Sequence, residues 1–135
     1  MPIRPSKLRA RRESRQAARA RFDRLVEAAL ASLPPRFQPY LEGVAILVED
    51  WPDPDDLDAL GVPPDETIFG LQRGPTLAEQ GLVPFPPTIV IYRGPIEEAC
   101  ETDAEIQREV RTTVLHEVGH YFGMSEADLD RLGLA

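Results

Sequence analysis

The feature that most constrains this sequence is a pair of histidines one helical turn apart. His116 and His120 are the two histidines of the chain, and Glu117 directly follows the first. Residues four positions apart on a helix point the same way, so both imidazoles can reach one metal ion. Glu117 is rotated by about 100° from His116, where it can reach a water held by that ion. The stretch therefore predicts a helix that offers two zinc ligands and a catalytic carboxylate, Glu117.

A catalytic zinc site takes a third protein ligand and leaves its fourth position to water. Only fifteen residues follow His120, so we expect this ligand nearby, after a chain reversal. Glu126 is the first candidate, and Asp128 is the alternative, although Asp128 is also expected to form a capping box with Ser125. We therefore predict one Zn²⁺ per chain, held by His116, His120 and Glu126, and leave Asp128 open.

Two helices are expected to form most of the core. The first contains residues 14–33, has one apolar face and stops at Pro34 and Pro35. The second begins near Thr102 or Asp103, carries the histidines and ends at Gly123 as a C-cap. Gly119 in this helix would let the final segment approach closely. The apolar positions are Ala18, Phe22, Leu25, Val26, Ala29, Leu30 and Leu33 in the first helix, and Ile106, Val110, Val114, Val118 and Tyr121 or Phe122 in the second.

Three short apolar segments predict strands. They are residues 44–51, 67–73 and 88–93, and the third is rich in β-branched residues. Residues 52–66 predict a loop with one helical turn, and short helices are expected at 96–100 and after Ser125. The order of elements predicts an α+β fold, with a small sheet packed on the long N-terminal helix and the helix that carries HExxH. The length indicates a single domain over residues 1–135.

Charge is distributed unevenly along the chain. Residues 1–24 carry nine Lys and Arg against two acids, a balance of +7, whereas residues 25–135 have a balance of −15. We interpret residues 1–15 as a solvated basic extension of the N-terminal helix. Nucleic acid is not an expected partner, because no aromatic residues or known recognition module accompany the basic ones.

The remaining composition points to a reducing compartment. The single cysteine, Cys100, excludes an intrachain disulfide. The longest apolar run, Val44–Val48, is far shorter than the roughly 18 residues that a membrane span requires. The basic N-terminus lacks the apolar segment of an export signal. We therefore expect a cytoplasmic protein with no membrane partner.

The segment HEVGHYFGMSE, residues 116–126, resembles the HExxHxxGxxD pattern of the Asp-zincin metallopeptidases. Over most of its length the chain is similar to a small bacterial family of single-domain, minimal zincin-like proteins. The resemblance implies a small mixed sheet that faces an active-site helix and whose edge strand pairs with an extended substrate. It also implies zinc bound by His116 and His120, with Glu117 as general base. The chain departs from the pattern at Glu126, where the family has Asp.

We predict a zinc-dependent metallopeptidase that hydrolyses a peptide or protein substrate by metal-activated water. Tyr92 and Arg93, at the end of the third predicted strand, are the upstream candidates for stabilising an oxyanion. The alternative is a catalytically inactive zincin-fold protein that acts as a protein-binding or metal-binding module, with the basic extension making the contact. A third hypothesis, an RNA-associated protein, is disfavoured by the acidic balance of residues 25–135.

Overall fold

A three-stranded mixed sheet forms the centre of the computed structural model, which describes residues 4–79, 81 and 86–131. The strand order is β1-β3-β2, with β1 at Ala45–Glu49, β2 at Gly70–Arg73 and β3 at Thr88–Tyr92. β1 runs parallel to β3, and β2 runs antiparallel to it. The apolar run of β3 fits its central position, because four of its five residues are buried. β1 and β2 are the two edges of this sheet.

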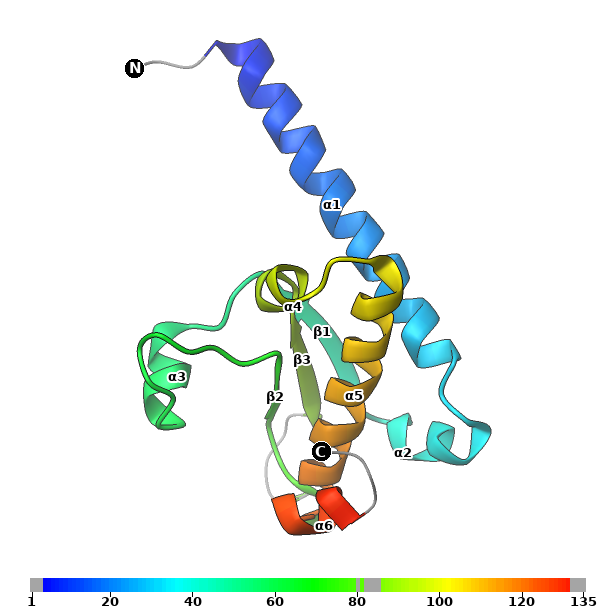
Figure 1. Cartoon of the computed structure of the whole chain (residues 1–135). Helices are drawn as coiled ribbons and strands as arrows, with labels where there is room; N and C mark the ends of the chain where they lie inside the picture. The colour runs from blue at the N-terminus through cyan, green and yellow to red at the C-terminus, as the bar shows by residue number, and fades with distance from the viewer. Residues whose placement is uncertain (1–3, 80, 82–85, 132–135) are drawn as a thin grey trace.

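Two long helices cover one face of the sheet (Figure 1). They are α1, Pro5–Ala31, and α5, Asp103–Tyr121. α1 begins nine residues before the predicted start at residue 14 and projects away from the rest of the molecule over its N-terminal half (Figure 1). Both predicted apolar faces are confirmed. The core residues are Phe22, Val26, Ala29 and Leu33 of α1, Ile89 and Ile91 of β3, Ile96, and Ile106, Val110, Val114 and Val118 of α5.

Short helices connect or follow these elements. α3, Pro54–Ala59, is capped by Asp53, whose carboxylate accepts a hydrogen bond of 2.8 Å from the Asp55 amide. α4, Arg93–Ala99, starts directly after β3, so β3 is one residue shorter than the predicted strand. Their bounds are Pro35–Phe37 (η1), Gln38–Leu41 (α2), Pro54–Ala59 (α3), Leu77–Glu79 (η2), Arg93–Ala99 (α4) and Glu126–Arg131 (α6).

The α+β architecture with a small mixed sheet, a long N-terminal helix and an HExxH helix is confirmed. The β1 and β2 strands are shorter than their predicted segments, and the helical turns of 35–41 were not predicted. The short helix predicted after Ser125 is α6, and residues 132–135 lie outside the described residues. The single-domain boundary at 1–135 stays a prediction. Among the described residues, no helix is long and apolar enough to cross a membrane.

Candidate metal centre

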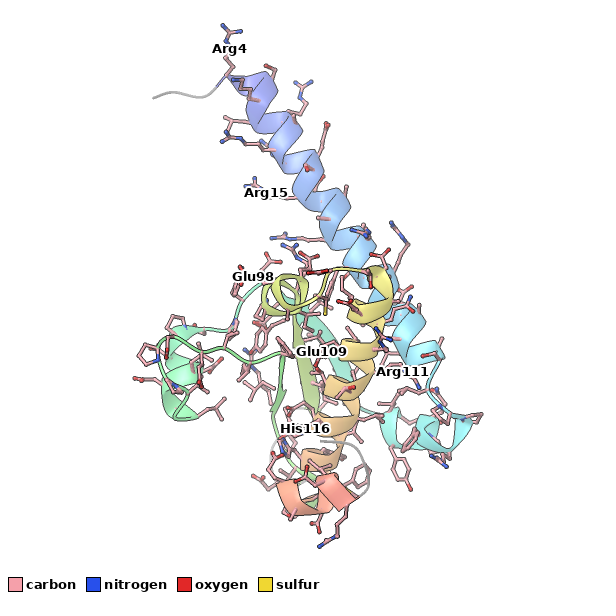
Figure 2. The ribbon with its side chains drawn as sticks, viewed as in Figure 1. Arg4, Arg15, Glu98, Glu109, Arg111 and His116 are labelled. Atoms are coloured by element: carbon pink, nitrogen blue, oxygen red, sulfur yellow. The ribbon has the colours of Figure 1, made fainter. Side chains whose placement is uncertain are left out.

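The last two turns of α5 carry the histidine pair. α5 is capped at its start by Thr102, whose hydroxyl accepts a hydrogen bond of 3.1 Å from the Glu105 amide. Its buried stripe fixes the rotation of the helix, and the two histidines lie on the flank of that stripe, partly exposed. The ring centroids of His116 and His120 are 4.5 Å apart. Figure 2 places His116 at the end of α5 nearest α6.

The chain reverses directly after α5 through a glycine C-cap. Gly123 has φ +78°, a conformation that residues with a Cβ rarely adopt. Its amide donates to the His120 carbonyl at 3.0 Å, and the Met124 amide donates to the Gly119 carbonyl at 2.9 Å. These two bonds form a Schellman motif, which satisfies the last carbonyls of the helix. The predicted role of Gly123 is therefore confirmed.

α6 then packs back against α5. Ser125 and Asp128 exchange hydrogen bonds of 2.9 and 3.1 Å, which is the predicted capping box. Leu129 of α6 is fully buried and lies over Gly119, where an added Cβ would be 2.3 Å from Leu129 Cδ2. Gly119 therefore allows the close approach that was expected of it. The result is that Glu126, at the first position of α6, faces the two histidines.

Three ligand atoms converge at this point. One oxygen of Glu126, Oε1, lies 3.2 Å from His116 Nε2 and 3.0 Å from His120 Nε2. All three atoms lie within 4.8 Å of one another. Ligands of a tetrahedral zinc, at roughly 2.0–2.2 Å from the ion, are about 3.4 Å apart, so these residues fit the ion. Two imidazoles and one carboxylate also leave one coordination position open.

Asp128 does not belong to this group. Its carboxylate accepts from the Ser125 amide and pairs with Arg131. The hydrogen bonds from Ser125 lower the pKa of Asp128 below its ordinary value. Of the two predicted candidates for the third ligand, the structure thus brings Glu126, and not Asp128, to the histidines.

The pKa values of His120 and Glu126 depend on each other. Burial lowers the pKa of His120, but the hydrogen bonds that its ring donates to Glu126 and Glu117, together with the negative charges of these carboxylates, outweigh burial and raise that pKa above the ordinary value. The pKa of Glu126 is lowered, chiefly by its hydrogen bond with His120. Without an ion, the carboxylate is thus stabilised by a proton on the imidazole. A metal ion would replace this proton as the partner of both groups.

Glu117 lies next to the ligands without being one of them. Its side chain is buried, and Oε2 lies 3.2 Å from His120 Nδ1. With Nε2 of His120 directed at the ligand group, Nδ1 is the nitrogen that donates to Glu117. The Glu117 carboxylate therefore orients the His120 ring. It also faces the space beside His116.

That space is a cavity of about 300 Å³ between α5 and β2. His116, Glu117 and Thr113 line its α5 side, and Phe69 and Gly70 line the opposite side. Gly70 sets the narrow spacing, because an added Cβ would lie 2.4 Å from Thr113 Cγ2. Sequence reasoning identified His116 and Glu117 but did not identify Phe69, Gly70 or Thr113 as part of the site. A glycine inside a strand pattern was the available signal, since it often marks a close backbone approach.

Tyr92 and Arg93 do not lie at this cavity. The Tyr92 hydroxyl accepts a hydrogen bond of 3.3 Å from Arg73, and Arg93 pairs with Asp50 and Glu97. Both residues are at the end of β3 that leads into α4, away from α6 (Figure 1). The hypothesis that one of them stabilises an oxyanion is therefore not supported by their positions.

Comparisons with known proteins identify a family and a related solved structure. A family model described as zincin-like metallopeptidase matches residues 41–134, more than two thirds of the chain. The chain is also similar to a solved conserved hypothetical protein from Thermus thermophilus, with 26% identity. That similarity covers 83% of this chain and 94% of the other, with a TM-score of 0.49. No curated protein matches the sequence significantly.

Proposed function

This chain belongs to the zincin-like metallopeptidase family, and from that premise we propose that it is a zinc-dependent peptidase. The observation that carries the proposal is the convergence of His116 Nε2, His120 Nε2 and Glu126 Oε1 within 4.8 Å of one another. The three residues come from two elements, α5 and α6. Their spacing in sequence is that of the HExxHxxGxxD pattern of the Asp-zincins, with Glu126 in place of Asp.

Each polar group of the site has a distinct task in this proposal. His116, His120 and Glu126 would hold the zinc ion, leaving one position for water or substrate. When bound, zinc lowers the pKa of water and polarises a carbonyl group. Glu117 accepts the proton of the attacking water at its carboxylate and delivers it to the leaving amine. Its burial, at 7% exposed, limits competition from bulk water.

The cavity and the sheet edge indicate how a peptide would bind. β2 is an edge strand, and Gly70 at its start lines the cavity beside His116. An extended peptide can add to this edge through main-chain hydrogen bonds. One of its side chains would then enter the cavity, where Ile68 and Phe69 provide apolar contacts. We therefore propose an extended peptide with an apolar side chain next to the scissile bond as substrate. The proposed location of the protein is the cytoplasm.

A peptide-library experiment tests the proposed activity. The zinc-loaded protein is incubated with a mixture of unstructured peptides, and the products are identified by mass spectrometry. We expect cleavage by the wild type and a loss of at least about 100-fold in Glu117→Gln, which keeps the ligands but removes the base. A folded, zinc-loaded wild type that cleaves no peptide would contradict the proposal.

One observation favours a second candidate, a catalytically inactive zincin-fold module that binds a metal or a protein. Among the described residues, no Arg, Lys or Tyr lines the cavity beside His116. A cationic or phenolic donor for the developing oxyanion is thus missing from the described lining of the cavity, whose hydroxyl groups come from Thr112 and Thr113. This candidate predicts full zinc occupancy together with inertness in the library experiment.

A further inference from the structure

The N-terminal half of α1 forms an arm outside the folded body. We define the arm as residues 6–20, which are exposed apart from Ala18, half-buried where the arm meets the body. Figure 2 shows Arg15 on this projecting part of the helix and Arg4 just before the helix begins, both away from the sheet. Leu8, at 44% exposed, is an uncovered apolar residue on it. A solvated helix of this length gains little stability alone, so a partner that covers the arm would stabilise it.

One side of α1 changes charge along its length. At 3.6 residues per turn, Arg9, Arg12, Arg19, Asp23 and Glu27 lie within an arc of about 80°. The three arginines lie between residues 9 and 19, and the two acids follow at residues 23 and 27. Arg9, Arg12, Asp23 and Glu27 form no ion pair with any residue from 4–79, 81 or 86–131. This side of the helix is therefore complementary to itself in the antiparallel orientation.

The acidic half of this side borders a groove. The groove has a volume of about 360 Å³ and lies between α1 and the edge strand β1. Asp23 and Glu27 line it together with the apolar side chains of Val26, Leu30, Ile46 and Leu47. Leu47 is 49% exposed although it lies in the middle of β1. An apolar floor with two acids on its rim fits a helix that carries a leucine flanked by arginines.

We propose that the groove binds the arm of a second copy of this chain, so that two molecules exchange arms in an antiparallel dimer. In the register that places Arg12 opposite Asp23 of the second copy, Arg9 lies within one residue of Glu27 of that copy. Leu8 then reaches the level of the groove. The two-fold axis falls between Gln16 and Arg19, so both arms bind in the same way. The dimer is independent of the metal centre, which lies on α5 and α6.

Charge favours a second copy over other partners of a basic helix. Residues 1–24 have a balance of +7 and residues 25–135 one of −15, so each molecule carries both signs. A nucleic acid or an anionic membrane that bound the arm would be repelled by the rest of the same chain. A second copy instead offers Asp23 and Glu27, which are four residues apart, against three residues between Arg9 and Arg12, and which form no ion pair within the described part of the chain.

A charge-swap experiment tests the dimer by sedimentation velocity. One variant, Arg9→Glu with Arg12→Glu, reverses the charge of the arm. The other, Asp23→Arg with Glu27→Arg, reverses the charge of the groove. We expect a dimeric wild type, and at least about tenfold weaker association of each variant alone, because four attractive pairs become repulsive. Mixing the two variants restores the dimer. In the mixed dimer the arm of reversed charge binds the groove of reversed charge, and the other arm and groove keep their wild-type charges. Asp58→Arg with Glu66→Arg, two exposed acids outside the groove, is the matched control and stays dimeric.

The outcomes separate the alternatives. The restored heterodimer would also show that both variants fold. A monomeric wild type, variants that remain dimeric alone, or a mixture that stays monomeric would each overturn the proposal. Binding of the monomeric wild type to single-stranded RNA or to anionic vesicles would assign the arm to another partner and overturn it as well.

Discussion

Glu126 is the residue on which the metal site depends most, because it is the ligand that α5 does not supply. Its side chain is 66% exposed, so packing around the side chain does not hold it in place. Its position comes instead from the backbone, through the reversal at Gly123 and the capping box that starts α6. A glutamate in this place, rather than an aspartate, reaches both histidine nitrogens with one oxygen.

Removal of this ligand should weaken zinc binding. Loss of a residue that only orients a metal ligand typically costs 10- to 100-fold in affinity, so we expect Glu126→Ala to cost at least about 100-fold. A competition titration with a chromogenic chelator measures the effect. Asp130→Ala, an exposed carboxylate of the same helix, is the control and should bind zinc as the wild type does. A larger loss in Asp128→Ala than in Glu126→Ala would assign the third ligand to Asp128.

Zinc affinity should also depend on pH through His120. Zinc binds the neutral imidazole, and the raised pKa of His120 keeps its proton bound to a higher pH than usual. The apparent affinity is therefore expected to fall as the pH is lowered from 8 towards and below about 6.5, the ordinary pKa of histidine. Calorimetry in buffers of different ionisation enthalpy should show proton release on zinc binding. A constant affinity between pH 8 and 6 is the result that would count against this.

At the scale of elements, the site is formed where α5 packs against β2 and α6. The helix and its two histidines were predictable, because buried positions every three or four residues and the HExxH spacing are local patterns. The reversal at Gly123 and the return of Glu126 were predictable for the same reason. The cavity was not, since it requires Gly70 to meet Thr113, more than forty residues later in sequence. Strand order and register likewise depend on contacts between distant segments.

The Gly70–Thr113 contact can be tested by a double-mutant cycle. An added Cβ at Gly70 would overlap Thr113 Cγ2, and the Val90 carbonyl lies 3.0 Å away. Gly70→Ala should therefore lower the free energy of unfolding by about 1–3 kcal/mol, as overpacking does. Thr113→Ser removes the overlapping methyl group and should restore part of this loss in the double variant. Urea unfolding measures all four proteins, and strict additivity of the two changes would contradict the contact.

At the scale of the whole molecule, Asp50 connects three elements at one end of the sheet. It follows β1 and pairs with Arg19 of α1 and with Arg93 of α4, the latter at 3.0 Å. Burial raises the pKa of Asp50, but the hydrogen bonds and charges of the two arginines outweigh it and lower that pKa. This junction anchors the base of the arm to the body, next to where the exposed part of α1 begins.

The contribution of Asp50 to stability should vanish in acid. Because its pKa is lowered in the folded state, its stabilisation is present above the unfolded pKa of about 3.9 and is lost as the pH falls through the folded pKa. Asp50→Asn should reduce the free energy of unfolding by less than about 1 kcal/mol at pH 7, since water screens this partly exposed group. The difference from wild type should shrink towards zero near pH 2. Equal differences at both pH values would argue against the ion pairs as the cause.

The metal content of the purified protein tests the central claim most directly. Wild type and His116→Ala are saturated with zinc and dialysed against metal-free buffer. Their zinc content is then measured by inductively coupled plasma mass spectrometry. We expect about one zinc ion per wild-type chain and almost none in the variant, which retains only two of the three ligands. Because His116 is partly exposed and outside the buried stripe of α5, the variant should remain folded by circular dichroism. A wild-type chain that retains no more zinc than His116→Ala would contradict the account.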